Sequence, residues 1–358
     1  MQHLTNVDSE WQKFISCNNY ESENEKIIKS TLQIPKCSPI YISTKTMITY
    51  LNTEVDLVPI FWKIKVMPYQ CTRNGVIKKQ IKMTSFSKSE VETINTHLDD
   101  EIICSSRVIS EINNPKLKVP FKYVQKINVG VSKKELISYR SKERGAFYNC
   151  FALIFRILYK GEFKEVHVKV FNTGKLEIPG IQSNDLLFKT LDELLKILRP
   201  HINTNIQYNN TKMETVLINS NFKCGYFIDR YKLHSILKNK YKTISIFDPC
   251  SYPGIQSKFY YNAMHEIQNG VCSCSKKCEK GGSGNGDGEC MEISFMIFRT
   301  GSILIVGHCD EPELHIVYAF LEKLFLDEFN NINDGLCDVF KQPKKTKKIK
   351  MKKIIVSL

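Results

Sequence analysis

The sequence predicts an α+β fold in which a duplicated module builds one curved antiparallel sheet, with helices on the convex face and an open concave face. Three observations lead to this prediction. Two eleven-residue segments, 170–180 and 297–307, share Phe, Thr, Gly, Ile and Gly at five positions and lie 127 residues apart. Each segment continues an alternating strand, crosses a Thr-Gly turn and enters a second strand. A long amphipathic helix follows each of them. This offset is too long for a solenoid unit and suits a duplicated half-domain.

The first repeat is expected at residues 39–201, after an N-terminal arm at residues 1–38. It opens with TKTMITYL, which alternates as a strand does, and continues with DLVPIFWKIKV, which suits a short helix. Residues 71–145 interrupt the repeat. Because they are polar and rich in Lys and Ser, they are expected to form a peripheral subdomain.

The second repeat is expected at residues 211–330 and follows the same order. Residues 213–237 predict a strand and then a helix, as at the start of the first repeat. A glycine-rich insertion at 266–290 interrupts this repeat between two strands. A basic tail, 331–358, follows it.

The alternation of the strands assigns side chains to the two faces of the sheet. The valines at alternate positions of 166–170 suit burial against the helices, which places Lys169 and Phe171 on the open face. Lys175 lies on the same face beyond the turn. In the second copy Phe298 occupies the place of Phe171. Two aromatic residues at equivalent strand ends indicate a shared function, or else both pack under a neighbouring loop.

Composition and charge limit the class of protein. Hydrophobic residues make up 42% of the chain and charged residues 25%, as in globular proteins. No run of 18 apolar residues and no apolar signal core occurs, so neither a membrane helix nor secretion is expected. The net charge is +14, and eight of the lysines lie in residues 341–353. This polycationic segment suits nucleic-acid contact or a nuclear address, or else only solubility.

Four of the 13 cysteines are clustered, at Cys272, Cys274, Cys278 and Cys290. Four thiols this close in a chain without a secretory signal suit a structural tetrahedral zinc site, with His265 as an alternative ligand. The spacing is not that of a standard zinc finger. The other interpretation is a disordered Gly-Ser loop with incidental thiols.

These features resemble the TATA-binding protein family, and more closely its divergent relatives in large nucleocytoplasmic DNA viruses. The family repeat has a Phe before a Ser/Thr-Gly turn, a strand that ends in Gly and a long helix, as at residues 171–180 and 298–307. The family's Tyr-Glu-Pro-x-x-Phe-Pro-Gly is similar to residues 247–254, FDPCSYPG. The resemblance covers roughly residues 40–70, 147–200 and 212–330.

The resemblance implies a saddle that binds the minor groove of A·T-rich DNA and bends it with paired aromatic wedges. Tyr252 and Phe298 would form the wedge pair of the second repeat. The first repeat would use Phe171 with Phe147, which is preferred over Tyr148 and Phe151 because it opens the strand that follows. The resemblance and the strand faces together give the expected DNA-contacting residues, which are Phe147, Phe171, Tyr252, Phe298, Lys169, Lys175, Thr215 and Val306.

The sequence departs from the family pattern at several of these places. The minor-groove asparagines of the family are replaced near Thr44 or Lys45 and near Thr215. Glu177 lies on the open face, where phosphates repel a carboxylate. Pro179 and Val306 replace threonines before each closing Gly. These departures predict weaker or different sequence readout.

Two functions of different classes remain open. The first is a transcription initiation factor that binds DNA with a transcription factor IIB-like protein and an RNA polymerase. The second is a protein-interaction factor of a transcription complex that has lost specific TATA binding. No enzyme motif occurs, so no enzyme is expected, and a repair enzyme is disfavoured. The resemblance leaves the nucleus, a viral cytoplasmic factory and the virion open as sites of action.

Overall fold

A computed structural model describes residues 34–137, 147–276, 278 and 281–336. Most of the expected N-terminal arm and nearly all of the basic tail, including its eight lysines, lie outside the described residues. The chain divides into two compact units. The first unit contains Ile42–Ser220, and the second is built on Asn221–Ile305 with the C-terminal helices. Among the described helices, none has the length and apolar character needed to cross a membrane.

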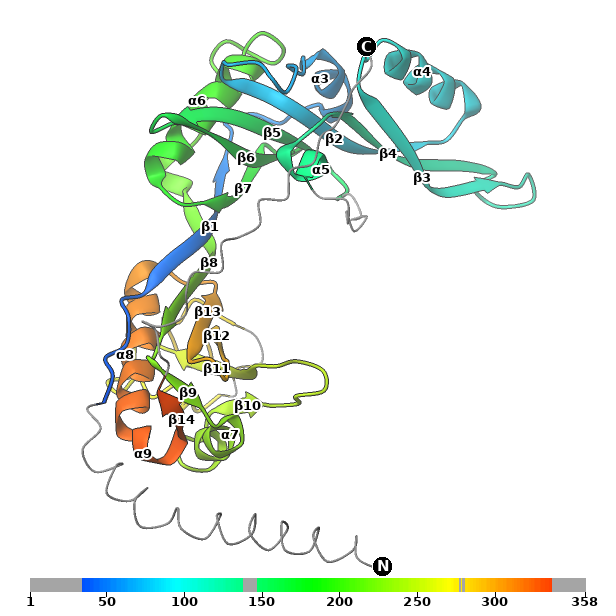
Figure 1. Ribbon diagram of the computed structural model, residues 1–358. Helices are drawn as coiled ribbons and strands as arrows, with labels where there is room; N and C mark the ends of the chain where they lie inside the picture. Colours follow the sequence, from blue (N-terminus) through cyan, green and yellow to red (C-terminus); the bar gives the residue numbers. More distant parts are fainter. Residues whose placement is uncertain (1–33, 138–146, 277, 279–280, 337–358) are drawn as a thin grey trace, which may run out of the picture. The chain divides into compact units, whose positions relative to one another are not determined.

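The first unit is an antiparallel sheet with two helices on one face (Figure 1). Its strands are hydrogen-bonded in the order β8-β1-β7-β6-β5-β2-β4-β3. Leucines of the long helix α6 pack on the valines of β6 and form the core. Ser183 caps this helix, as expected, because its Oγ accepts the Leu186 N–H at 3.3 Å. The elements are β1 (Tyr41–Tyr50), α3 (Leu57–Lys63), β2 (Gly75–Ser85), β5 (Cys150–Tyr159), β6 (Glu162–Phe171), β7 (Lys175–Ile181) and α6 (Asn184–Leu198).

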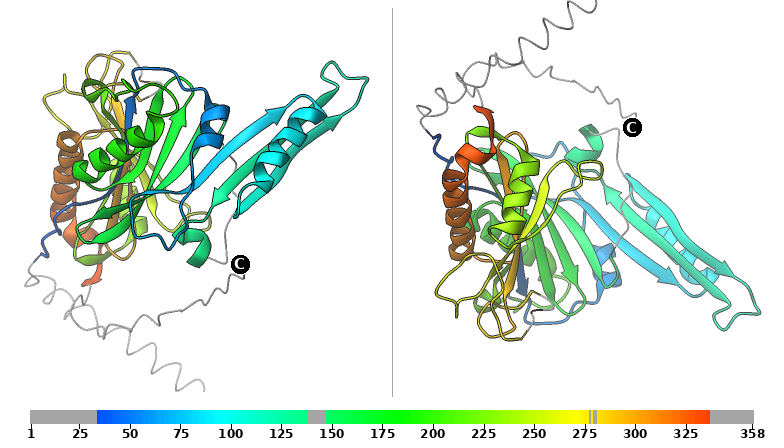
Figure 2. Two further views of the ribbon diagram at one scale, coloured as in Figure 1. Left: turned by 90° about the horizontal axis from the view of Figure 1, so that it is seen from above. Right: turned by 90° about the horizontal axis from the view of Figure 1, so that it is seen from below.

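Between β2 and β5 an inserted segment lengthens this sheet. Its strands β4 and β3 pair in turn beyond β2, and α4 lies along the extension (Figure 2). Ile94 and Leu98 of α4 join the main hydrophobic core, so the insertion is packed onto the repeat. The inserted elements are α4 (Lys88–Asp99), β3 (Cys104–Asn113), β4 (Phe121–Gly130) and α5 (Lys133–Ile137).

The second unit has the same element order on a smaller scale. Strand β8 runs out of the first unit into the second, and β10, β11, β12 and β13 pair in sequence order. A short ladder joins β9 and β14. The elements are β8 (Glu214–Lys223), β9 (Tyr226–Ile228), α7 (Arg230–Asn239), β10 (Ile244–Ile246), β11 (Ile255–Tyr261), β12 (Met291–Ile297), β13 (Ser302–Gly307), α8 (Glu311–Asp327), α9 (Phe329–Ile332) and β14 (Asn333–Leu336).

The duplication expected from the repeat is present in the secondary structure. β7 and β13 begin at Lys175 and Ser302, which are 127 positions apart, and α6 and α8 begin at the same offset. β1 and β8 have equal lengths, and each is followed by a helix that begins seven residues after the strand ends. The α+β class and the large antiparallel sheet are therefore confirmed. In the first repeat strand β2 pairs beside β5, which is the position that β10 occupies beside β11 in the second repeat.

The turn glycines explain why Thr-Gly occurs in both copies. Gly174 has φ +76° and Gly301 has φ +68°, a region that glycine adopts without strain. A Cβ at Gly174 would overlap the carbonyl oxygen of Thr53, and one at Gly301 would overlap that of Tyr226. Each turn therefore packs against the backbone segment that follows the first strand of its repeat.

Candidate nucleic-acid interface and metal centre

The predicted division of side chains between the two faces is confirmed in both repeats. Val166, Val168 and Val170 are buried, whereas Lys169 and Phe171 on alternate positions are half-buried. In β12 and β13 the apolar residues at alternate positions are buried as well, and Phe298 is half-buried; the buried residues are Ile293, Phe295, Ile297, Ile303 and Ile305. Neither Phe171 nor Phe298 is fully covered by the described chain.

The wedge pair expected in the second repeat is assembled. The ring centroids of Tyr252 and Phe298 lie 5.9 Å apart with an interplanar angle of 60°. A Cβ at Gly254 would come 3.0 Å from both rings, so the glycine leaves the room that the pair occupies. The Phe298 N–H donates to the Ser302 carbonyl at 3.0 Å, which ties its backbone to the turn. An edge-to-face aromatic pair therefore lies beside the start of β11 and the end of β12, at the end of this strand pair away from the 266–290 insertion.

Strand register identifies the residue of the first repeat that corresponds to Tyr252. Ile255 lies opposite Ile297 in the second repeat, and Phe151 lies opposite Val170 in the first. Because Val170 and Ile297 are equivalent, Phe151 corresponds to Ile255. Counting three residues back from each places Tyr148, rather than Phe147, in register with Tyr252. Sequence reasoning preferred Phe147; counting back equally from both strands would have selected Tyr148.

Both candidates lie at the surface of the first unit beside lysines. Phe147 is 63% exposed and Tyr148 is 60% exposed, whereas Phe151 is fully buried in the core. The Lys169 Nζ lies 4.1 Å from the Phe147 ring centroid. The Lys82 Nζ lies 3.2 Å from the Tyr148 ring centroid. The hydrogen bond from Lys82 lowers the pKa of Tyr148 from its ordinary value. Sequence reasoning did not single out Lys82.

The carboxylate on the open face is neutralised by a neighbour. Lys169 and Glu177 are directly opposite across β6 and β7, and their Nζ and Oε1 atoms lie 2.6 Å apart. The expected repulsion between Glu177 and phosphates is therefore offset, and the Lys169 charge is shared. Lys175 lies beside Phe171, with its Nζ 5.6 Å from the ring centroid.

The remaining expected contacts lie on or near the central strands. Thr215 and Val306 are half-buried, and the Thr215 Oγ1 lies 3.4 Å from the Met47 Sδ. An asparagine that sequence reasoning missed occurs on this face of β8. Asn219 is four residues after Thr215, and its Nδ2 donates to the Thr44 Oγ1 at 3.3 Å. An amide side chain therefore lies on β8 two strand alternations beyond the position at which the family resemblance implied one.

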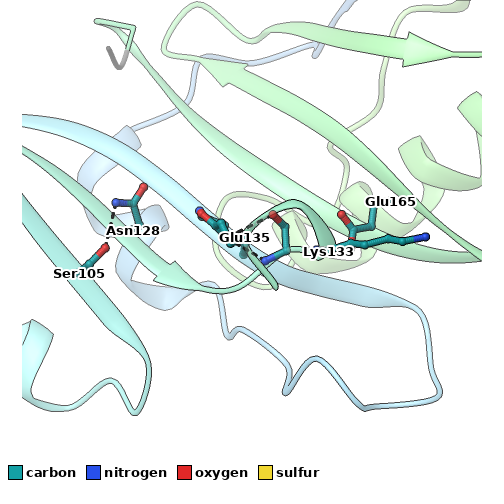
Figure 3. A network of polar contacts seen from close by, with 7 residues as sticks. Ser105, Asn128, Lys133, Glu135 and Glu165 are labelled. Carbon is teal, nitrogen blue, oxygen red and sulfur yellow. Dashed lines mark hydrogen bonds and ion pairs between the residues drawn. The ribbon is translucent and has the colours of Figure 1, made fainter. Parts of the chain in front are cut away.

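Helix α5 covers one part of the open face (Figure 3). Lys78 of β2 pairs with Glu135, which also accepts from the Ser132 N–H at 2.9 Å. The Lys133 N–H donates to Glu165 of β6 at 2.8 Å. These bonds fasten α5 across β2 and β6, so the exposed part of the face lies toward Phe171.

The four clustered cysteines converge in the second unit. All four Sγ atoms lie within 4.8 Å of one another. The Cys274–Cys290 distance is 3.4 Å and the Cys272–Cys278 distance is 3.5 Å, without a disulfide among the described cysteines. Four sulfurs about 2.3 Å from a central ion are about 3.8 Å apart, so the cluster fits a tetrahedral ion. His265 lies outside the four, with its Nε2 3.9 Å from the Cys274 Sγ.

Burial and hydrogen bonds act in opposite directions on these thiols, and burial raises the pKa of Cys278 and that of Cys290. The Cys290 N–H donates to the Cys278 Sγ at 3.3 Å, and the Asn262 Nδ2 lies 3.5 Å from the Cys274 Sγ. Burial opposes ionisation of Cys272, but hydrogen bonds from the Cys274 backbone and from neighbouring thiols outweigh it and lower its pKa to about 7. The four convergent thiols are a donor set that could hold a metal ion.

Comparison with known proteins agrees with the resemblance seen in the sequence. No protein-family model matches the chain. A protein of Acanthamoeba polyphaga mimivirus described as TATA-box-binding protein-like is 25% identical in an alignment of 198 residues that covers 52% of this chain and 50% of that protein. The chain thus spans about half the length of this relative. Among solved structures it is similar to Methanococcus jannaschii TBP, with a TM-score of 0.40 and 10% identity, over 81% of this chain and 99% of that one.

The fold defines the class as a duplicated α+β module that carries aromatic residues at equivalent strand ends. Within that class, the sequence relation confirms the expected resemblance to the TATA-binding protein family. The chain is similar, at 25% identity over about half its length, to the TATA-box-binding-protein-like viral protein.

Proposed function

We propose that the chain is a transcription initiation factor that binds A·T-rich promoter DNA in the minor groove and bends it. The observation that carries the proposal is the Tyr252–Phe298 pair, repeated by Phe171 with Tyr148 and Phe147 at the equivalent strand ends. An apolar wedge partly unstacks a base step at a cost of a few kcal/mol, and the bent duplex then contacts more protein surface. Flexible steps such as TA reduce that cost.

The partners follow from the same proposal. A factor of this kind would act with a transcription factor IIB-like protein and an RNA polymerase, in the nucleus or a viral cytoplasmic factory. It would act by binding and not as an enzyme. The name of the mimivirus relative supports a role in transcription in general.

Gel-shift and bend assays on A·T-rich duplexes test the proposal. We expect wild-type protein to bind with a bend, and Phe171→Ala and Phe298→Ala each to reduce the bend angle and weaken binding tenfold or more. Phe188→Ala is the matched control, because this partly exposed aromatic lies on α6, away from the open face. A double Phe171→Ala/Phe298→Ala variant with unchanged binding and bending would refute the wedge mechanism.

One observation favours the interaction factor as the second candidate. Lys169, expected to contact DNA, is paired with Glu177. If wild-type protein does not shift any A·T-rich duplex yet forms a complex with polymerase components, this second function is the correct one.

We also propose that the four cysteines bind zinc in a structural role. Cys272, Cys274, Cys278 and Cys290 would hold the ion, which would staple the 266–290 loop. Metal analysis of purified protein should give about one zinc per chain. Cys274→Ser should abolish it and Cys71→Ser, outside the cluster, should not. Equal, near-zero metal in all three proteins would end this proposal.

A further inference from the structure

The strands of the insertion continue the face on which the first wedge residues lie. Gln80 of β2 lies opposite Ala152 of β5, and Ala152 lies opposite Lys169 of β6. Directly opposed residues share a face of a sheet, as do residues two apart in one strand. Lys82 therefore lies on the same face as Lys169 and Phe171.

Three cations stand in directly opposed positions on this face. Lys82 lies opposite Lys126 of β4, and Lys126 lies opposite Arg107 of β3. We call these three residues the cation row. Arg107 is exposed, and both lysines are half-buried. Because neighbouring strands are about 4.8 Å apart, the row extends over roughly 10 Å.

The charge of this surface is of one sign along its strands. Lys122, two pairs further along β4, lies on the same face. Among the described positions of β2, β4 and β3 that the register assigns to this face, none is an acid. Like charges directly opposite each other destabilise a sheet, and an anionic ligand on this face would offset that repulsion.

The row is continuous with the proposed wedge site. The Lys82 Nζ lies over the Tyr148 ring, and Tyr148 is the register counterpart of Tyr252. We infer that the cation row binds the phosphate backbone of duplex DNA beside the step into which the first repeat's aromatic residues insert. This inference rests on the proposed DNA binding. The same face carries wedge and cations, which favours duplex DNA over an acidic protein.

Such contacts would position the duplex without reading its sequence. They would extend the footprint beyond the duplicated module, because β3 and β4 are added strands. Each phosphate neutralised contributes about 0.9 to the slope of log K against log salt concentration. The row would therefore account for up to about 2.7 of that slope.

The test compares two triple variants of equal charge. Lys82→Gln/Lys126→Gln/Arg107→Gln removes the row, and Lys88→Gln/Lys116→Gln/Lys118→Gln removes three exposed lysines elsewhere in the insertion. We expect the row variant to lose at least tenfold in affinity at low salt and two to three units of salt slope, with the bend retained. The control should change both much less. Thermal melting of the row variant should match that of wild type, which shows that the substitutions leave the fold intact.

The possible outcomes separate the two proposals. Loss of the bend in the wedge variants with an unchanged salt slope in the row variant would overturn the inference and leave the proposed function standing. If both triple variants lost the same affinity and salt slope, net charge alone would explain the effect, and the inference would be overturned as well. Binding of an acidic polymerase fragment that depends on the row, without any DNA effect, would assign the surface to a protein partner. Absence of DNA binding by wild-type protein would refute both proposals.

Discussion

The two repeats carry insertions that are held in place by different physical means. In the first repeat the insertion adds strands β3 and β4 to the sheet, and α4 closes over them with Ile94 and Leu98 in the core. In the second repeat the insertion between β11 and β12 is a glycine-rich loop in which four thiols converge. It has no helix or strand among its described residues.

The difference shows what an insertion needs in order to be structured. The first insertion spans two strands and two helices and buries apolar side chains, so backbone pairing and hydrophobic burial suffice. The second is too short and too rich in glycine to bury a core, so we expect its order to depend on the proposed metal crosslink. The repeat accommodates both insertions, because each connects two paired strands, β2 with β5 and β11 with β12.

Of all the tests, metal removal should give the largest difference in stability between the two insertions. We expect chelation of zinc to lower the free energy of unfolding of the second unit by about 4 kcal/mol, if free zinc stood 1,000-fold above the dissociation constant. The first unit should be unaffected. Hydrogen exchange of residues 266–290 and of β3 and β4, with and without chelator, measures this. Equal protection of the loop in both conditions would contradict a metal-held insertion.

A buried charge anchors the first insertion, and removing its partner should cost about 3 kcal/mol. The Lys79 Nζ is buried and lies 2.8 Å from Glu101 and 2.9 Å from the Ile64 carbonyl oxygen. Glu101→Gln would leave the ammonium poorly compensated, whereas Lys79→Met should be close to neutral. Denaturant unfolding of both variants checks this; similar costs would show that the ion pair does not anchor the insertion.

The same lysine predicts a pH dependence. Burial lowers the pKa of Lys79, so the folded protein releases this proton before the unfolded chain does. Stability relative to Lys79→Met should therefore rise as the pH increases from the folded pKa toward the unfolded value of about 10.4. A constant difference between the two proteins across alkaline pH would show that the ammonium is not desolvated.

The turn glycines are a feature that the two repeats share, so substituting them should have a similar effect in each. Gly174→Ala and Gly301→Ala should each destabilise their own unit by about 2 to 3 kcal/mol, since both combine a positive φ with overlap against a backbone oxygen. Gly161→Ala is a useful control, because its φ is also positive but a Cβ there meets no atom within 4 Å. If all three substitutions cost the same, backbone strain alone would explain the effect.

The smallest expected effect is the acid sensitivity of the second unit. Glu328 accepts from Lys240, from Asn331 and from Tyr241 at 3.2 Å. Burial opposes its ionisation, but these bonds outweigh burial and lower the pKa of Glu328. Its contribution is therefore complete above the unfolded pKa of about 4.3 and is lost as the pH falls through the folded pKa. Glu328→Gln should cost about 2 kcal/mol at pH 7 and less at pH 3; a pH-independent cost would contradict this.

Local patterns in the sequence were sufficient for much of the fold. The repeat at 127 residues located both hairpins, because the turn requires Gly in each copy. The alternation of Val166, Val168 and Val170 assigned the faces of β6, because the side-chain period of a strand is two. The cysteine spacing predicted the thiol cluster, because three of the four ligands lie within seven residues.

What the sequence by itself determined is therefore the module: its strands, its faces, its turn glycines and its thiols, all set by contacts between near neighbours. The tertiary structure alone decided which residues stand opposite one another. It paired Lys169 with Glu177 and aligned Lys82 with Lys126 and Arg107. The physical reason is that strand register depends on pairing between distant segments, and the pattern within one strand does not specify its partner's position.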